Sequence, residues 1–423
     1  MPGSTYPAHK TAESMHRSAH AIPVRVQHEA SPVKFVFFAN TDWYLYNFRL
    51  ATALRLKADG HEVVMLSPPG PFGARFAASG LRWITLSMDR ASLGPVREAR
   101  TLFALISALR RERPDLLHNF TLKCAIYGAL AARVVRVPAV VNAVAGMGYV
   151  FTSNRTKARV LRPLVSWLLR LSLDRPRSLL ILQNPDDATA FAAARLVPAD
   201  RVRVIRSSGV DVRRFTPVAS DSPVHGRLRV LLAARLLWEK GVQEYVDAAA
   251  LLRREGRSVE FLLAGTPDPG NPRSVEEAQV KRWGREGLVR CLGHVEDMPA
   301  LLREVEVMVL PSYYREGVPR SLIEAAACGL AIITTDRPGC REVVTHHGVD
   351  GLHVAVRDAR ALADRIAQLD DDRVLLARLG ARARQRALSE FDEQLVIQRT
   401  VDVYRELLRP APSATRPTVR PMP

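Results

Sequence analysis

Short apolar runs alternate with amphipathic segments along most of the chain, and this alternation stops once and restarts. Each run is about as long as a buried strand, and the segments between the runs carry apolar residues at helical spacing. In the first half the predicted strands are 34–39, 61–67, 82–88, 115–119, 139–143, 178–183 and 202–206. In the second half they are 229–234, 259–264, 289–292, 305–310 and 331–335.

Continuously apolar strands separated by helices are typical of a parallel sheet with both faces covered. The restart therefore predicts an α/β protein with two doubly wound, Rossmann-like domains that face a central cleft. The domains are 34–210 and 229–390, joined by a linker at 211–228. We expect a last helix at 391–409, and disorder in the basic segment 1–33 and in the tail 410–423, which is rich in Pro, Arg and Thr.

Length and composition agree with two cores, because 423 residues with 47% hydrophobic content exceed one ordinary domain. The four cysteines show no C-x-x-C spacing and lie in or beside apolar runs, which favours packed, reduced thiols in a reducing compartment. The sequence has no run of about 18 apolar residues and no signal-peptide core near its start. We therefore expect a cytoplasmic protein.

The most informative stretch surrounds Glu316 and Glu324, directly after the apolar run 305–310. Gly317 allows a sharp turn out of the strand, and Pro319 suits the first turn of a helix. We therefore expect a helix from about Val318, with the carboxylates about 12 Å apart along it and free N–H groups between them. Such a helix end favours a diphosphate, which leaves the carboxylates to bind hydroxyl groups on either side.

Two cations stand at the corresponding place after the first strand of the second half, Arg235 and Lys240. Fixed cations in a cleft stabilise the charge that a departing diphosphate develops. The alternatives are a local carboxylate partner for Arg235, a solvated Lys240, and an i to i+4 pair between Glu324 and Arg320. A diphosphate or a partner carboxylate suits Arg320 equally.

These motifs resemble the retaining glycosyltransferases of family four, whose fold is GT-B, over about residues 34–409. Several segments of the first half resemble the bacterial branch that includes N-acetylgalactosaminyltransferases acting on undecaprenyl-diphosphate-linked sugars. The motifs that carry the resemblance are 208–215, 235–241 and 316–324, and those that carry the branch are 40–49, 67–70, 118–123 and 141–151. The chain lacks the Gly-Gly pair that many members carry after their first strand.

The resemblance implies a role for each of these residues. Glu316 would bind the transferred sugar and Glu324 the ribose, while His118 would contact the donor sugar and the positive charge that develops on it. The donor-binding set would be Arg235, Lys240, Gly317, Val318, Pro319 and Arg320 beside Glu324. The last helix, 391–409, would pack back toward the first domain.

Loops at the carboxyl ends of the first-half strands supply acceptor-binding candidates. The set is Asn40, Thr41, Asp42, Thr121, Lys123, Gly146 and Gly148. For Asp42 a helix cap is equally plausible, for the glycines a plain turn, and for Lys123 a stem that covers apolar surface.

The positive charge is concentrated in the first half of the chain. Residues 1–210 hold 29 basic and 13 acidic side chains, whereas the remainder holds 32 and 30. Segment 154–177 combines seven basic residues with apolar ones that include Trp167, and it predicts an amphipathic helix suited to an anionic membrane. A core-facing crossover helix is the alternative.

Together these features predict a retaining transferase that moves a sugar from a nucleotide donor to a lipid-linked saccharide in surface glycan assembly. The resemblance implies a UDP-linked hexose or N-acetylhexosamine as the donor. We expect no metal or other cofactor, no nucleic acid partner, and a peripheral position on the inner face of the cytoplasmic membrane. The alternatives are a soluble GT-B enzyme, either a small-molecule glycosyltransferase or a sugar-nucleotide epimerase, and a nucleic-acid-binding protein.

Overall fold

Seven parallel strands form the first sheet of the computed structural model, which describes residues 31–89, 94–146, 156–173, 175–218 and 226–409. The strand order is β3-β2-β1-β4-β5-β6-β7. The strands are β1 (Lys34–Phe38), β2 (Glu62–Ser67), β3 (Arg82–Thr85), β4 (Leu116–Phe120), β5 (Ala139–Val144), β6 (Ser178–Leu182) and β7 (Val202–Val204). The helices between them are α1 (Asp42–Ala58), α2 (Gly73–Ala78), α3 (Pro95–Glu112), α4 (Leu122–Val135), α6 (Thr156–Leu173) and α7 (Pro185–Ala193).

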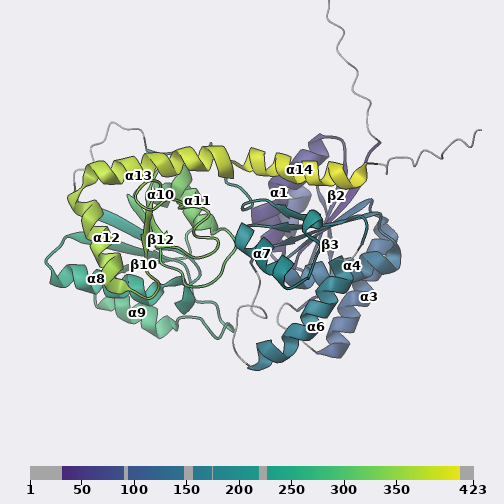
Figure 1. Ribbon diagram of the computed structural model, residues 1–423, viewed down its shortest axis with the longest axis horizontal. Helices are drawn as coiled ribbons and strands as arrows, with labels where there is room; N and C mark the ends of the chain where they lie inside the picture. The colour runs from purple at the N-terminus through teal and green to yellow at the C-terminus, as the bar shows by residue number, and fades with distance from the viewer. Residues whose placement is uncertain (1–30, 90–93, 147–155, 174, 219–225, 410–423) are drawn as a thin grey trace, which may run out of the picture. The chain divides into compact units, whose positions relative to one another are not determined.

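Helices cover both faces of this sheet, as its continuously apolar strands require. Helices α3, α4 and α6 lie side by side on one face, where Leu105 and Leu109 of α3 pack with Val36 and Phe38 of β1 (Figure 1). The other face is covered by α1, α2 and the last helix, α14 (Glu393–Leu408).

The second sheet has six parallel strands in the order β10-β9-β8-β11-β12-β13. The strands are β8 (Leu228–Ala233), β9 (Val259–Ala264), β10 (Arg290–Gly293), β11 (Val307–Leu310), β12 (Ala331–Thr335) and β13 (Leu352–Val354). The helices are α8 (Val242–Arg254), α9 (Glu277–Arg285), α10 (Met298–Leu302), α11 (Arg320–Ala327), α12 (Ala359–Asp371) and α13 (Arg373–Arg386). Strand β13 was not predicted from the sequence.

Two hydrophobic clusters enclose the second sheet. One contains α8, α9, α12 and the start of α13, and the other contains α10, α11 and the π-turn Ala387–Phe391. Cys291 lies on the edge strand β10 and is exposed, so the expectation that all four cysteines are packed is wrong for this one.

The chain passes between the sheets twice, at adjacent places. The backbone N–H of Val210 donates to Phe391 O at 2.8 Å, and that of Glu393 donates to Val210 O at 3.0 Å. Val212 and Phe215 are buried in the second core, so the predicted linker is largely packed at its start. Helix α14 then lies on the first sheet, with Tyr404 in its core.

Both sheets reverse their strand order at one point, between β1 and β4 in the first and between β8 and β11 in the second. Ligands of open parallel sheets bind beyond the carboxyl ends of strands at such switch points. The loops after these four strands carry most of the residues predicted to bind substrate.

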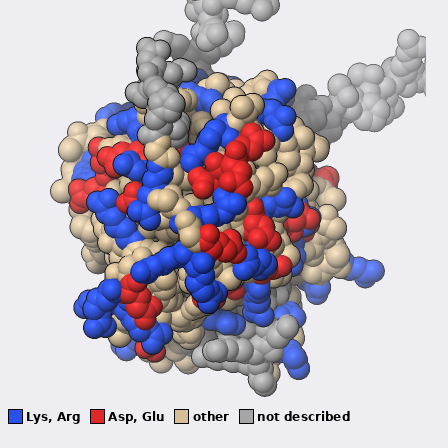
Figure 2. Space-filling model, turned by 90° about the vertical axis from the view of Figure 1, so that its left-hand side faces the viewer, with Lys and Arg blue, Asp and Glu red and all other residues tan. Residues whose placement is uncertain are grey.

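Surface charge is mixed on the second half of the chain. Figure 2 views the side on which Figure 1 labels α8, α9 and α12, and basic and acidic side chains are interspersed there. Ion pairs such as Arg257 with Asp371 and Arg360 with Glu255 account for part of this pattern. In the described ranges, no helix has the length and apolar character that crossing a bilayer requires.

Candidate active site

A nearly buried ion pair joins the two switch-point loops of the second sheet. Lys240 ends the turn Trp238–Lys240 after β8, and its Nζ contacts Oε2 of Glu316 in the loop after β11. The side chains are only 14% and 11% exposed. Oε1 of Glu316 accepts a hydrogen bond from Ser312 Oγ at 2.6 Å. Glu316 is therefore held at both oxygens, and the predicted proximity of Lys240 and Glu316 is observed.

The expected helix start near Val318 is wrong, because α11 begins at Arg320 and Pro319 is its N-cap with ψ of 122°. A residue that precedes proline is driven to extended backbone, which delays the helix. Glu316 therefore lies in the loop before α11, and only Glu324 lies on the helix.

Residues of both domains hold the backbone of this loop. The Val318 N–H donates to Gln183 Oε1 at 3.0 Å. A Cβ at Gly317 would lie 2.2 Å from the same oxygen, and one at Gly339 would lie 2.0 Å from Gly317 O. At Gly339 only glycine fits, because the close atom belongs to the backbone, whereas a side chain at Gly317 would displace Gln183 from its bond to Val318. The N–H that was expected to face a diphosphate is bonded to Gln183.

Gly146 of the first domain lies directly against this loop. It has a φ of +76°, and a Cβ there would lie 3.2 Å from Gly317 N. The structure therefore brings Gly146 to the site predicted from the second half. Gly148 lies outside the described residues.

Glu324 forms the i to i+4 pair that the sequence analysis raised as an alternative. Arg320 Nε donates to Glu324 Oε1 at 2.7 Å, and the guanidinium of Arg320 also contacts Asn47 O and lies 5.1 Å from the Phe48 ring. Burial raises the pKa of Glu324, and the charge of Arg320 opposes that rise. Arg320 thus connects α11 with α1 of the first domain.

Arg235 is not part of the Lys240 and Glu316 pair. Its NH1 donates to Asp268 Oδ2 at 2.7 Å, and its side chain is 62% exposed. This is the local carboxylate partner that was the alternative reading of Arg235. Arg315, beside Glu316, has a buried partner in the first domain, because its Nε donates to Asp187 Oδ1 at 2.8 Å.

His118 is buried at the third position of β4, with 1% exposure. Its Nδ1 lies 2.6 Å from the Tyr404 hydroxyl of α14, and its Nε2 has no partner among the described residues. Burial and the nearby charge of Arg49 hold the pKa of His118 well below its usual value, so the ring is neutral at pH 7.

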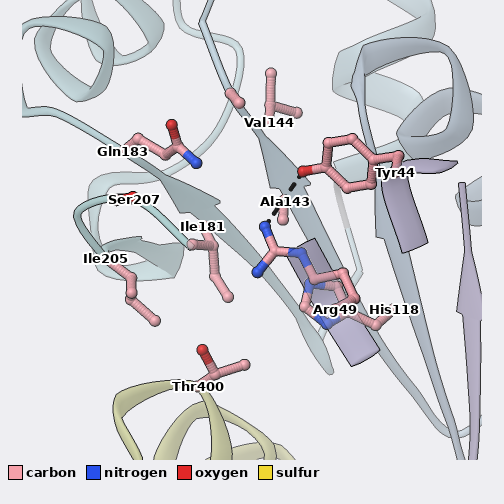
Figure 3. A pocket seen from close by; sticks show the side chains of 11 residues that line it. Tyr44, Arg49, His118, Ala143, Val144, Ile181, Gln183, Ile205, Ser207 and Thr400 are labelled. Carbon is pink, nitrogen blue, oxygen red and sulfur yellow. Dashed lines mark hydrogen bonds between the residues drawn. The ribbon is translucent and has the colours of Figure 1, made fainter. Parts of the chain in front are cut away.

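The imidazole of His118 lines a small pocket (Figure 3). It is lined by Tyr44, Arg49, His118, Ala143, Val144, Ala145, Ile181, Gln183, Ile205, Ser207 and Thr400. Ala145 and Gln183 also contact the Gly317 loop, so this pocket adjoins the Glu316 site.

The loop after β1 is ordered by its own side chains. Thr41 Oγ1 caps α1 by accepting from Tyr44 N at 3.1 Å, whereas Asp42 accepts from Phe72 N at 2.7 Å and is 5% exposed. The cap is therefore Thr41, and the carboxylate of Asp42 fixes the neighbouring loop. Asn40 is half-buried at the end of β1.

Thr121 and Lys123 flank the start of α4. Thr121 has a φ of +76°, which is rare for a residue with a side chain. Lys123 Nζ donates to Glu98 Oε1 at 3.0 Å and to Asp89 O at 2.7 Å. Its ammonium is thus engaged with α3 and the segment before it.

Helix α6 has one face in the core of the first domain and another that is exposed. Leu169 and Leu173 are buried against the first domain, but Val160, Leu164 and Trp167 are 71%, 52% and 57% exposed. These three recur at helical spacing and share one face. Arg155 lies outside the described residues.

Sequence reasoning missed Ser312, Gln183, Arg49 and Tyr404. Ser312 and Gln183 are polar residues at the ends of buried strands, which is a usable signal. Arg49 and Tyr404 sit in amphipathic helices, where nothing local distinguishes them from surface residues. In the described ranges, no three His, Cys, Asp or Glu residues gather as a metal site.

Comparisons with known proteins agree with this architecture. Residues 46–208 match the family described as "Glycosyl transferase 4-like domain", and residues 227–372 match "Glycosyl transferases group 1". The chain is 28% identical to the N,N'-diacetylbacillosaminyl-diphospho-undecaprenol alpha-1,3-N-acetylgalactosaminyltransferase of Campylobacter jejuni, over 88% of this chain and 98% of that protein.

A second relative is the glycogen synthase of Mycobacterium tuberculosis, 31% identical over 84% of this chain and 88% of that protein. Among solved structures, Anabaena Alr3699/HepE in complex with UDP superposes with a TM-score of 0.71 at 21% identity, covering 89% of this chain and 100% of that one. The chain belongs to the family-four glycosyltransferases, and its two Rossmann-like domains are a GT-B fold.

Proposed function

We propose that this glycosyltransferase moves a sugar from a UDP-sugar donor to a saccharide carried on a lipid diphosphate, with retention of anomeric configuration. The observation that carries the proposal is the Lys240 and Glu316 pair. It lies in loops at the carboxyl ends of the second sheet, and the Glu316 loop contacts Gly146, which follows a strand of the first sheet. The Campylobacter relative is named for a diphospho-undecaprenol substrate, and the Anabaena structure holds UDP.

In the proposed reaction the bond between the sugar C1 and the donor phosphate oxygen breaks, and a new bond forms from C1 to the acceptor hydroxyl oxygen. The hydroxyl proton passes to the leaving phosphate oxygen on the same face of the sugar. Lys240 stabilises the charge on the departing diphosphate, and Glu316 holds hydroxyl groups of the transferred sugar. The scheme assigns no step to a metal or to a protein nucleophile.

Glu316→Gln tests the assignment. We expect turnover to fall about 100-fold or more, because a fixed charge near the reacting centre is lost. The matched control is Glu260→Gln at the start of β9, where the carboxylate pairs with Arg229 and Arg290 at the opposite ends of the strands. The assay screens UDP, GDP and their sugars by calorimetry and then follows transfer to membrane extracts. Wild-type turnover by Glu316→Gln would reject the role.

We also propose that α6 rests on an anionic membrane. Its exposed apolar face, Val160, Leu164 and Trp167, lies on the basic half of the chain, and a lipid-linked acceptor requires access to the bilayer. Trp167→Ser with Leu164→Gln should reduce sedimentation with phosphatidylglycerol vesicles. Val374→Ser is the control, since Val374 is 80% exposed on α13. Unchanged sedimentation of the double variant would contradict this placement.

A further inference from the structure

The strongest unexplained feature is a buried positive charge in the pocket beside His118. Arg49 of α1 is 7% exposed, and no carboxylate of the described residues lies within ion-pair distance of it. A guanidinium keeps its charge in proteins, and a buried charge is costly unless it is paired. The charge of Arg49 is therefore buried without a carboxylate partner among the described residues.

The contacts of Arg49 leave part of its guanidinium without a hydrogen-bond partner. NH2 donates to the Tyr44 hydroxyl at 3.2 Å, and the guanidinium lies 4.6 Å from the Phe120 ring centroid. The Nε has no partner, although it is buried. Figure 3 shows the guanidinium facing into the pocket toward Ile181 and Gln183.

Other groups in the pocket also suit an anionic oxygen. The neutral His118 ring leaves Nε2 unpartnered beside Arg49, while its Nδ1 is bonded to Tyr404. If the Tyr404 hydroxyl donates to Nδ1, Nε2 carries the proton and faces the pocket as a donor. Ser207 lines the same space with a φ of +66°, a strain that recurs at ligand sites.

The space is small, with room for about one water molecule, so it admits one oxygen atom of a ligand and not a sugar ring. The rest of the ligand must lie outward, where Gln183 and Ala145 contact the loop of Gly317 and Val318. A phosphate with one oxygen on Arg49 would therefore lie next to the sugar-transfer site.

We propose that Arg49 binds a phosphate oxygen of a diphosphate, with the His118 Nε2–H as a second donor. This inference rests on the proposed function for the source of the ligand. Within that function the diphosphate comes from the nucleotide donor or from the lipid-linked acceptor. Lys123 was predicted to bind the acceptor diphosphate, but its ammonium already donates to Glu98. Arg49, in contrast, has no carboxylate partner among the described residues, and a phosphate would supply the opposite charge.

Calorimetry with three probes tests the site: inorganic pyrophosphate, UDP and farnesyl diphosphate. Arg49→Met keeps the length and the apolar stacking but removes the charge, so we expect about 10- to 100-fold weaker binding of at least one probe. Loss for UDP identifies the donor as the source, and loss for farnesyl diphosphate alone identifies the acceptor. The control is Arg75→Met, because Arg75 also stacks on aromatic rings, Tyr46 and Phe72, but is exposed.

Melting of the free protein separates binding from a structural role. Removing an unpaired buried charge should leave the melting temperature of Arg49→Met equal to or above that of the wild type. Wild-type affinity of Arg49→Met for all three probes would overturn the proposal. If Arg49→Met does not fold, Arg49→Lys should bind the probes at least about tenfold more tightly than Arg49→Gln does. Equal affinities of these two variants would overturn the proposal.

The outcome also separates this inference from the proposed function. Sugar transfer by Arg49→Met at the wild-type rate, with wild-type probe binding, removes the anion site and leaves the function standing. Pyrophosphate binding that depends on Arg49, in a protein that transfers no sugar, leaves the site standing and removes the function.

Discussion

The ion pair between Lys240 and Glu316 should show strong energetic coupling. Lys240→Met leaves a carboxylate that keeps only its hydrogen bond from Ser312, and Glu316→Gln leaves an ammonium beside a neutral amide. Breaking a buried pair on one side costs about 3–5 kcal/mol when the remaining charge is fully buried. Here each side chain retains some exposure, 14% and 11%, so a smaller loss is expected.

We expect Lys240→Met to lose about 2–3 kcal/mol of unfolding free energy and Glu316→Gln about 1–2 kcal/mol, because glutamine still accepts from Ser312. The double variant buries no lone charge and should lose about 1–2 kcal/mol in total. The coupling energy is then about 2 kcal/mol in magnitude, well above the additivity expected of independent sites.

The assay is urea denaturation of the four proteins, followed by both circular dichroism and tryptophan fluorescence. Two cores need not unfold together, so coincident transitions are required before free energies are compared. Repeating the cycle in 0.5 M NaCl should change the coupling little, since a nearly buried pair is poorly screened. Losses that simply add, in a cycle with coincident transitions, would refute the reasoning.

Three further perturbations test other parts of the site. Gly339→Ala should destabilise the protein more than Gly348→Ala. Both glycines have a positive φ, but only at Gly339 would a Cβ clash with backbone atoms, and the difference between the melting temperatures of the two variants measures that clash. Because the pKa of His118 is lowered in the native state, His118 binds a proton in the unfolded chain at a pH where the native ring stays neutral. The free energy of unfolding therefore falls by up to about 1.4 kcal/mol per pH unit below pH 6.5. His118→Asn should flatten that slope in urea titrations, and an unchanged slope would contradict the burial argument. Burial raises the pKa of Asp187 and the bond from Arg315 opposes that rise, so the stability that Arg315→Met loses relative to the wild type should be smaller at pH 5 than at pH 8. Equal losses of stability at both pH values would show that Arg315 does not act by neutralising the charge of Asp187.

The sheets were predictable because buried parallel strands are continuously apolar, and eleven of the predicted runs overlap strands longer than three residues. The family signal was also local, since Glu316, Gly317 and Pro319 lie within four residues. The helix start differs from the prediction because a proline suits a first helical turn but also drives the preceding residue to extended backbone, and α11 begins only at Arg320.

Contacts between distant segments could not be predicted in this way. Gln183 bonds Val318 at a separation of 135 residues, and His118 meets Tyr404 at a separation of 286. Neither residue type nor period indicates such a pair, because each depends on how two sheets and a returning helix are placed.

The return of α14 to the first sheet explains why these distant contacts gather at one site. The chain leaves the first domain at Val210 and comes back at Glu393 through adjacent backbone hydrogen bonds. Its last helix then delivers Tyr404 to His118, at the carboxyl side of the sheet whose loops hold Gly317 and Val318 through Gln183 and Gly146. The two connections between the cores therefore lie side by side, next to the elements that supply the Glu316 loop and α14. The contacts of the Glu316 loop and the contact between His118 and Tyr404 therefore both depend on how the two domains are joined.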